Sequence, residues 1–436
     1  MSKLNDLAQK TADLQFFELP PEVITEARYC LLDTIGCGLL GSSLPEGKAI
    51  VSALRKMAGT GSAPVWGTDV CLPIDSCAMA CGSLTHLREL DDVHYSIVHP
   101  GSVCVPAAVA VAHTNDLTLR ELLFSLVVGY EVMIRVATGI NYMKHRLLGW
   151  HATATCGSFG AAATTAKLLG LDAAHTTWAL GLAGSRTGGT WAFTADGTMS
   201  KRLHPGLAAR DGVAAAYLAQ SGVTGPAFVL EAEDGGFYRV ASDDWNLDEL
   251  TADWGQTWDI TEMEYKWYAA CKSVHSPIEA AKSIQKRMRQ PAADIETVTV
   301  RVNSSGVAMA GHMYDPESVA SAQLSIPYGV ALALLGGEGG AADYATDKIK
   351  CQQAYDLAQK VKVVPSKELN QLRVTKHKSA AEVEVTWSDG SVEYARVEDP
   401  KGSIHNPLSK DELEQKFLSL AAPVVGSKAA EQLCRR

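Results

Sequence analysis

The spacing of apolar residues divides this chain into two kinds of structure. Up to about residue 262, apolar residues recur every three or four positions, which is the period of an amphipathic helix. Many of these positions are Ala or Gly, so we expect a closely packed, all-helical core. The pattern predicts helices over 20–41, 76–90, 103–114, 119–139, 152–169, 173–184 and 206–221.

Beyond this core, the apolar pattern alternates with period two, which is typical of half-buried strands. The alternation over 295–302 and 382–387, with a tight SDG turn into 391–397, predicts a hairpin and one further strand. Helical patterns accompany the strands at 275–290, 316–335 and 351–360. The sequence therefore predicts a mainly α protein with an α+β part, in which a large all-helical domain adjoins a smaller α/β domain.

The end of the chain is predicted to return to the helical domain. Ser409 and Glu412 have the spacing of a capping box, which begins a last helix. We expect that helix to pack on the N-terminal helices, so that the α/β domain is an insertion. We therefore assign residues 1–264 and 400–436 to the helical domain and residues 265–399 to the α/β domain.

Composition and charge narrow the class of partners. The chain has 436 residues, a net charge of −10 and a pI near 5.7. This charge argues against a nucleic-acid partner, because such proteins usually need a basic surface. The apolar run near 103–112 has about half the length of a membrane span, and residues 1–17 lack a secretory or transit layout. We expect a cytoplasmic protein without a nucleic-acid or membrane partner.

A basic, glycine-containing stretch is the most informative local feature (185–206, SRTGGTWAFTADGTMSKRLHPG). In an otherwise acidic chain, it contains four basic side chains: Arg186, Lys201, Arg202 and His204. Glycine permits close approach of the backbone to a ligand, and Lys, Arg and His donate charge-assisted hydrogen bonds to oxygen anions. We predict one wall of a site for a small carboxylated molecule. A helix starting near Pro205 is expected to point its free N–H groups at the anion.

A second polar cluster follows the predicted helix that ends near Leu87. It contains Glu89, Asp91, Asp92, His94 and His99. Groups of this kind suit acid/base chemistry, and a solvated helix end is the alternative. Their spacing matches no standard metal motif, and the ten cysteines include no CxxC pair, so we predict buried thiols and no metal.

His151 precedes a predicted helix, whose positive N-terminal dipole disfavours the charged imidazolium. A neutral imidazole there can act as a base or a hydrogen-bond donor, and a capping role is the alternative. His275 lies at the predicted domain boundary, where small-molecule pockets often occur. Gln323 and Tyr328 lie in another predicted helix that opens at a proline, and a tyrosine there can supply a proton or bind a carboxylate. For His275 the alternative is a structural role, and for Tyr328 it is a core or interface aromatic.

The absence of cofactor motifs limits the chemistry. The sequence contains no GxGxxG after a strand, no GxxxxGK followed by Ser or Thr, and no GxSxG. His and Lys beside an anion site suit removal of a proton next to a carboxylate, because cationic donors hold the developing charge. Dehydration, decarboxylation and epimerisation all need that arrangement.

Six stretches, taken together and in this order, resemble the MmgE/PrpD family, which includes 2-methylcitrate dehydratase, cis-aconitate decarboxylase and iminodisuccinate epimerase. The stretches are LLDTIGCGLLGS (31–42), HLRELDDVHYSIVHPGS (86–102), GWHATATCGSFGAAATTAKLLGL (149–171), DGTMSKRLHPGLAARDGVAAAYLAQSGVTGP (196–226), KWYAACKSVHSPIEAA (266–281) and PKGSIHNPLSKDELEQKF (400–417). The resemblance implies a large helical domain, a smaller α/β lid and a homodimer. It also implies no metal or organic cofactor, and an active site in the cleft between the two domains.

By this resemblance, Lys201 and His275 transfer protons, and His99 and His151 bind substrate carboxylates and share protons. Tyr328 closes the pocket or acts as an acid. The candidates for substrate binding are Glu89, Asp91, Arg186, His204, Lys266 and Gln323.

The expected function is that of a cofactor-independent lyase acting on a small di- or tricarboxylic acid. Dehydration is the first expectation and decarboxylation the second. An isomerase or epimerase of a small dicarboxylate is one alternative, and a non-catalytic carboxylate-binding protein is another.

Overall fold

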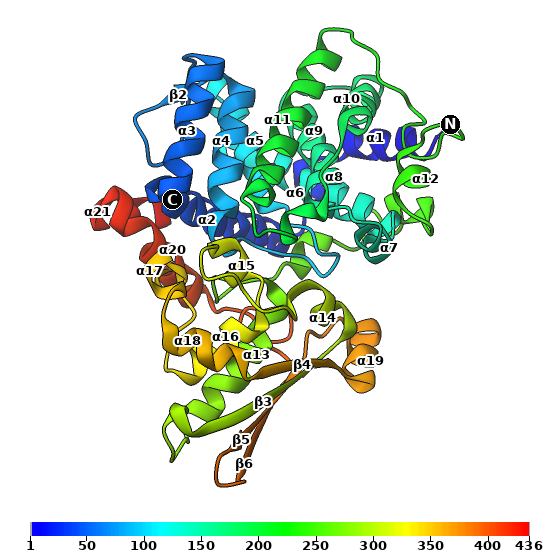
Figure 1. Cartoon of the computed structure of the whole chain (residues 1–436). Helices are drawn as coiled ribbons and strands as arrows, with labels where there is room; N and C mark the ends of the chain where they lie inside the picture. The colour runs from blue at the N-terminus through cyan, green and yellow to red at the C-terminus, as the bar shows by residue number, and fades with distance from the viewer. Residues whose placement is uncertain (1, 436) are drawn as a thin grey trace.

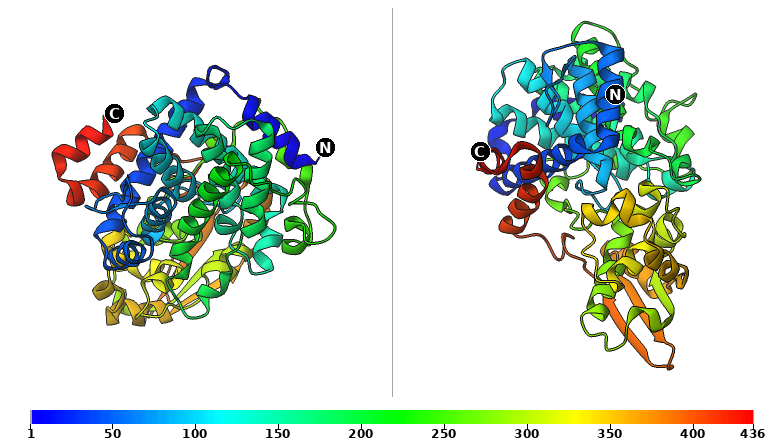
Figure 2. Two further views of the ribbon diagram at one scale, coloured as in Figure 1. Left: turned by 90° about the horizontal axis from the view of Figure 1, so that it is seen from above. Right: turned by 60° about the vertical axis from the view of Figure 1, so that its left-hand side comes forward.

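The computed structural model describes residues 2–435, which form two parts lying one above the other in Figure 1. The upper part consists of helices and one short hairpin, and the lower part combines helices with a four-stranded sheet. The right-hand view of Figure 2 keeps the two parts distinct, whereas in the view from above the helical part lies in front of the other. The predicted fold class, mainly α with an α+β part, is confirmed.

The helical domain combines the first two-thirds of the described chain with its last helices. Its helices are α1 (Lys3–Asp13), α2 (Pro21–Ser43), α3 (Pro45–Ala58), α4 (Ile74–Thr85), α5 (Gly101–Thr114), α6 (Leu119–Gly139), α7 (Tyr142–Leu147), α8 (Ala152–Thr155), α9 (Gly157–Leu168), α10 (Ala173–Arg186), α11 (Ser200–Gln220), α12 (Phe237–Ala241), α20 (Lys410–Val425) and α21 (Ser427–Cys434). A hairpin of β1 (Ala63–Pro64) and β2 (Cys71–Leu72) joins α3 to α4.

The centre of the helical domain is formed where α4, α5, α6, α9 and α11 pack against one another. Glycine permits one of these crossings, because a Cβ at Gly206 of α11 would overlap the carbonyl oxygen of Met79 in α4. Helix α6 is long and apolar enough to cross a membrane by length and composition alone. However, 89% of its most apolar window is buried inside the protein, as in a core helix.

The α/β domain is built on a mixed sheet with the strand order β4-β3-β5-β6. Its strands are β3 (Ile295–Val302), β4 (Val361–Pro365), β5 (Ala381–Trp387) and β6 (Val392–Val397). β3 pairs parallel with β4 and antiparallel with β5, and β5 and β6 form the predicted hairpin at the bottom of Figure 1. The helices of this domain are α13 (Lys272–Gln285), α14 (Ser304–Ala310), α15 (Val319–Gln323), α16 (Ile326–Leu334), α17 (Thr346–Ile349), α18 (Gln352–Gln359) and α19 (Lys367–Lys376).

After β6, the chain returns to the helical domain, where α20 packs against α2. Helix α20 begins at the predicted capping box of Ser409 and Glu412. Its Lys416 ammonium donates to Asp33 Oδ1 at 2.6 Å and to the carbonyl oxygen of Leu90 at 2.7 Å. This buried contact ties the C-terminal helix to the segment that follows α4.

Three predictions of local structure are wrong. Helix α11 begins at Ser200 rather than near Pro205, because a proline in the second turn removes only one helical hydrogen bond. The helix predicted over 316–335 is broken into α15 and α16, since Ser325 caps a new helix there. Strand β4 is missed because its five residues carry little periodic signal and gain their conformation from pairing with β3.

The cysteines are free thiols, and most are buried as predicted, but Cys71 and Cys351 are exposed.

Candidate active site

Glu89 occupies the point where the chain leaves α4. The helix ends at Thr85, earlier than predicted, and a single 3-10 turn over His86–Arg88 follows. Glu89 then adopts the left-handed conformation (φ 51°, ψ 34°), which is uncommon for a residue with a side chain. The turn places its carboxylate in the protein interior, where 1% of the residue is exposed.

Three buried cations converge on this carboxylate. Lys201 and Arg202, in the first turn of α11, donate to Glu89 Oε1, and Lys266 Nζ donates to Oε2 at 3.1 Å. Burial by itself raises the pKa of Glu89, but the nearby charges of Lys201, Lys266 and Arg202 hold that pKa well below its usual value. Glu89 is therefore ionised and holds cations from two separate segments together.

The two lysines respond differently to their shared burial. Burial lowers the pKa of Lys201, and the charges of Arg202 and Lys266 lower it further, against the pull of Glu89. The pKa of Lys266 is raised, because Glu89 and Asp91 together outweigh its burial. Lys201 is thus the amine that loses its proton more readily, which suits a base. Lys266 stays charged, which suits binding of an anion.

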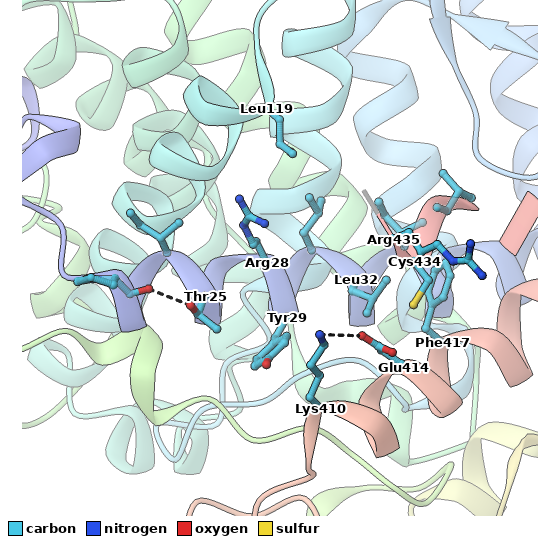
Figure 3. A pocket seen from close by; sticks show the side chains of 15 residues that line it. Thr25, Arg28, Tyr29, Leu32, Leu119, Lys410, Glu414, Phe417, Cys434 and Arg435 are labelled. Atoms are coloured by element: carbon cyan, nitrogen blue, oxygen red, sulfur yellow. Dashed lines mark hydrogen bonds and ion pairs between the residues drawn. The ribbon is translucent and has the colours of Figure 1, made fainter. Parts of the chain in front are cut away.

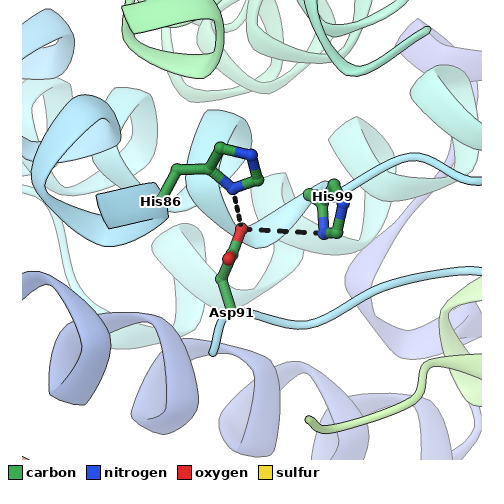
Figure 4. Close-up of side chains that lie close together, drawn as sticks. All are labelled: His86, Asp91 and His99. Carbon is green, nitrogen blue, oxygen red and sulfur yellow. Dashed lines mark hydrogen bonds and ion pairs between the residues drawn. The ribbon is translucent and has the colours of Figure 1, made fainter. Parts of the chain in front are cut away.

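Asp91 holds two imidazoles beside these cations (Figure 4). His86 Nδ1 lies 2.8 Å from Asp91 Oδ2, and His99 Nδ1 lies 3.7 Å from the same oxygen. His99 Nδ1 is also 2.7 Å from the carbonyl oxygen of Asp92, so this nitrogen carries the proton and donates. Burial lowers the pKa of both histidines, which are neutral near pH 7.

The same three side chains have the arrangement of a possible metal site, since their ligand atoms lie within 4.8 Å of one another. Two features oppose a cation there. The charge of Lys266 acts on both Asp91 and His99 and would repel a metal ion, and the Nδ1 proton of His99 is engaged by a carbonyl oxygen. The absence of a metal nevertheless stays a prediction.

His151 and His204 form a second pair of imidazoles, with their Nδ1 atoms 2.9 Å apart. His151 directly precedes α8, as predicted. His204 lies three residues after Lys201 on α11, so the two share a helix face. Burial and the charges of His204 and Lys201 lower the pKa of His151 well below its usual value, and burial lowers that of His204 to about 4.

The buried ion cluster consists of Glu89, Lys201, Arg202 and Lys266, and Gln323 connects the α/β domain to it. Its Oε1 accepts a hydrogen bond from Arg202 Nη2 at 2.8 Å, and its Nε2 donates to the carbonyl oxygen of Ala269 at 2.9 Å. Arg202 and Gln323 both line an open pocket of about 550 Å³ at the junction of the two domains, together with Thr198 and Ser318. Arg202 is therefore the residue of the buried cluster that borders this pocket.

His275 lies buried in the first turn of α13. Its Nε2 is 3.2 Å from the carbonyl oxygen of Ala270, and its buried Nδ1 has no hydrogen-bond partner within residues 2–435. Burial lowers its pKa well below the usual value, and the charges of Lys272 and Lys266 add to that effect. His275 is thus a neutral imidazole on the α/β side, within electrostatic reach of the ion cluster through Lys266.

Two predicted site residues do not join the cluster. Arg186 ends α10 with 64% of its side chain exposed, and its guanidinium lies 3.8 Å from Asp211. Tyr328 is buried in the core of the α/β domain, where its hydroxyl donates to the carbonyl oxygen of Asp343 at 2.7 Å and its ring packs on Tyr314. This geometry does not support Arg186 as a substrate-binding residue or Tyr328 as a catalytic residue.

A pocket of about 860 Å³ lies elsewhere, between α2, α20 and α21 (Figure 3). Its lining is mostly apolar and includes Leu32 and Phe417, with Lys410 and Glu414 paired at one side. None of its lining residues belongs to the ion cluster. Its size alone therefore assigns it no role in the chemistry.

The sequence did not point to His86 as a site residue, and it placed Arg202 in the basic wall of the site without a role of its own. Both occur in stretches that carry the family resemblance, and His86 stands five residues before its partner Asp91. Helical periodicity argues against Arg202 at the same site as Lys201, because the side chains of neighbouring residues in a helix point about 100° apart. Lys201 and Arg202 nevertheless reach one carboxylate, because both side chains are long.

Comparison with known proteins identifies the relatives of this chain. The model of the MmgE/PrpD N-terminal domain matches residues 5–250, and that of the MmgE/PrpD C-terminal domain matches residues 268–435. Cis-aconitate decarboxylase from Homo sapiens is 29% identical over 97% of this chain and 88% of its own length. The Aspergillus terreus (strain NIH 2624 / FGSC A1156) enzyme of that name is 27% identical over 98% and 91%. The 2-methylcitrate dehydratase of Escherichia coli (strain K12) is 25% identical over 77% and 72%.

Proposed function

Because this chain belongs to the MmgE/PrpD family and is an enzyme of its lyase type, we propose that it removes water or carbon dioxide from a small di- or tricarboxylic acid without a cofactor. Proton transfer at a carbon next to a carboxylate drives the reaction: dehydration begins with removal of a proton from that carbon, and decarboxylation ends with delivery of one. Dehydration is the first assignment and decarboxylation the second. One observation carries the proposal: Lys201, Arg202 and Lys266 converge on a single buried carboxylate beside neutral histidines.

The charge of the cluster supports binding of an anion. Lys201, Arg202 and Lys266 contribute three cationic groups, whereas Glu89 and Asp91 contribute two carboxylates, so one positive charge is in excess. An uncompensated buried charge is unfavourable, and a substrate carboxylate would compensate it. In this proposal Arg202 and Lys266 bind the substrate, while Glu89 and Asp91 hold the cations and imidazoles in place.

Proton transfer is assigned to groups whose pKa burial lowers, and Lys201, which is charged in the resting cluster, first gives up its own proton before it acts as a base. Lys201 takes the proton from the substrate carbon, since its pKa is lowered. His151 binds a second carboxylate and shares protons with the substrate. His99 also shares protons, but its Nδ1 proton is engaged by the carbonyl oxygen of Asp92, so its Nε2 acts as a proton acceptor. Lys266 stabilises the charge that develops next to the reacting carbon. His275 is the proton-transfer group on the α/β side: its Nε2 proton is engaged by the carbonyl oxygen of Ala270, so its free, unprotonated Nδ1 accepts a proton and can return it.

An epimerase of a small dicarboxylate remains the enzyme alternative. Lys201 and His275 come from different domains, and bases on two sides of one carbon invert its configuration.

We also propose a cytoplasmic homodimer without a nucleic-acid or membrane partner. The family resemblance supports the dimer, which sedimentation velocity tests, and the net charge of −10 supports the absence of a nucleic-acid partner.

The proposal is tested by incubating the purified protein in heavy water with citrate, 2-methylcitrate, cis-aconitate, malate or an amino-dicarboxylate. Mass spectrometry is expected to show loss of water or carbon dioxide from one of these acids. Deuterium uptake without loss of mass from the carbon skeleton would identify the epimerase alternative. The proposal is wrong if every acid stays both unchanged and unlabelled.

Two lysine variants sharpen this test. Lys201→Met keeps the length of the side chain but removes the base, and turnover is expected to fall by at least about 10²-fold, the lower end of what a general base contributes. Lys367→Met, at the exposed start of α19, is the matched control and is expected to keep wild-type turnover. Full turnover by Lys201→Met would exclude Lys201 as the base.

A further inference from the structure

His151 and His204 are joined by a hydrogen bond between their Nδ1 atoms, and the Nε2 atom of each ring is left without a partner among the described residues. Their Nδ1 atoms are 2.9 Å apart, and a neutral imidazole has one N–H group, so one Nδ1 donates and the other accepts. Within residues 2–435, the Nε2 atom of neither ring makes a hydrogen bond. Each outer nitrogen is therefore available to a substrate group or to water.

The two imidazole rings lie in different surroundings. His151 is 2% exposed, and its ring centroid is 6.2 Å from that of His86 in the buried cluster, whereas His204 is half-buried. Trp191 and Phe193 pack edge-on against His151, with centroids 5.3 and 6.0 Å away, and Phe193 packs in the same way against His204. These aromatic rings pack against the hydrogen-bonded pair, in which His151 is the more buried imidazole and His204 the more exposed one.

The backbones that carry both rings are held in place. The N–H of His151 donates to the carbonyl oxygen of Gly189 at 3.0 Å, and His151 directly precedes α8. His204 is held on α11, on the face that carries Lys201. The two imidazoles thus extend from the starts of two helices and meet in a hydrogen bond between their Nδ1 atoms.

We propose that His204 is a relay residue that carries protons between His151 and solvent. This inference rests on the proposed function, in which His151 shares protons with the substrate. A proton arrives at His151 Nε2, the proton on His151 Nδ1 moves to His204 Nδ1, and His204 releases its Nε2 proton to water. On each ring one N–H bond forms and one breaks, and both rings end neutral.

The relay also bears on the type of reaction. One outward transfer reverses the tautomers of both rings, which prepares the pair to carry the next proton inward. Dehydration and epimerisation each remove a proton from carbon and return one, to a leaving hydroxide or to the carbon, so every turnover restores the pair. Decarboxylation consumes one proton and would leave the pair reversed. The paired imidazoles therefore favour a reaction that removes and returns a proton.

The test uses His204→Ala, which leaves a space that free imidazole can enter. With a substrate deuterated at the reacting carbon, loss of the label to ordinary water is expected to slow by at least about 10²-fold. Added imidazole is expected to restore the exchange. His175→Ala, an exposed histidine paired with Asp172 on α10, is the matched control and is expected to change nothing. Unchanged exchange in His204→Ala, or a loss that imidazole does not restore, overturns the proposal.

A second measurement needs no substrate and separates this proposal from the proposed function. In protein labelled with 15N-histidine, the Nδ1 signals of His151 and His204 are expected to belong to one protonated and one unprotonated nitrogen, and His204→Ala is expected to shift the His151 signals. Unchanged His151 signals would show that no hydrogen bond joins the rings, and they overturn the relay. A wild-type protein that turns over no acid contradicts the proposed function instead.

Discussion

Glu89 shows how one residue sets the electrostatics of a whole site. Its left-handed backbone turns a carboxylate into the interior, where Lys201, Arg202 and Lys266 meet it. Without that carboxylate, three cations would share a buried space with Asp91 as their nearest other anion. A like-charged, desolvated cluster of this kind is strongly unfavourable.

Replacement of this residue tests the argument at the residue scale. Glu89→Gln is expected to destabilise the protein by about 3 kcal/mol, since removal of one partner from a buried ion pair leaves the others uncompensated. Urea unfolding measures this change. Glu384→Gln is the matched control, because its pair with Arg301 is 34% exposed on both sides, and an exposed pair contributes less than about 1 kcal/mol. Equal, small losses in both variants would contradict the assigned role of Glu89.

At the scale of elements, the start of α11 places most of the chemistry. Within two turns it contributes Lys201, Arg202 and His204, and then Gly206, where α11 crosses α4. The crossing is closest at Gly206, next to the backbone of Met79 and the side chain of Ser83. The position of the three functional side chains therefore depends on a glycine that takes no part in the chemistry.

Gly206→Ala is expected to cost about 1–3 kcal/mol, the usual range for overpacking, because the atom that the new Cβ meets belongs to a backbone that cannot turn aside. Turnover is expected to fall with it, as the first turn of α11 shifts away from Glu89. Chemical denaturation and steady-state rates measure both effects. Gly188→Ala serves as the control, since nothing lies within 4 Å of its added Cβ. If Gly206→Ala matches that control, the close crossing does not position the site.

At the scale of the whole molecule, burial shifts the pKa of many histidines and carboxyls. Burial lowers the pKa of nine histidines below the usual value of 6.5: His86, His94, His99, His145, His151, His204, His275, His312 and His377. Seven carboxyls act in the opposite direction. Burial raises the pKa of Asp92 and Glu131 to about 8 and that of Glu26 to about 7, and it also raises the pKa of Asp33, Glu231, Asp259 and Glu279.

Stability is therefore expected to fall as the pH drops below 6.5. The unfolded chain then binds protons at its histidines that the folded chain does not bind, so acid favours unfolding. The nine histidines outnumber the seven carboxyls, whose stabilising effect is lost as the pH rises instead. Urea unfolding at pH 7, 6 and 5 measures the slope of stability against pH. His275→Gln is expected to reduce that slope by up to about 1.4 kcal/mol per pH unit, and His113→Gln, at an exposed position, is the control. A stability that rises between pH 6.5 and 5 would contradict this account.

Much of this architecture is predictable from the sequence, because an element that buries one face has apolar residues at regular intervals. The three-to-four-residue spacing in α2 and α6, the alternation in β3 and β5 and the capping box of α20 each predict the element that forms. This pattern does not predict an element whose conformation depends on contacts with another element. Strand β4 depends on its pairing with β3, and the start of α11 at Ser200 depends on contacts of Lys201 and Arg202 with Glu89.

By itself, the sequence determined the fold class, the family and the residue types that gather around an acid, because these are recorded in local patterns and in motifs. Only the tertiary structure decided which of those residues meet. Lys201 and Lys266 reach Glu89 from 112 and 177 positions away, whereas Arg186 and Tyr328 lie apart from them. The structure also decided the direction of each pKa shift, since desolvation and unscreened charge arise only when packing removes water from these side chains.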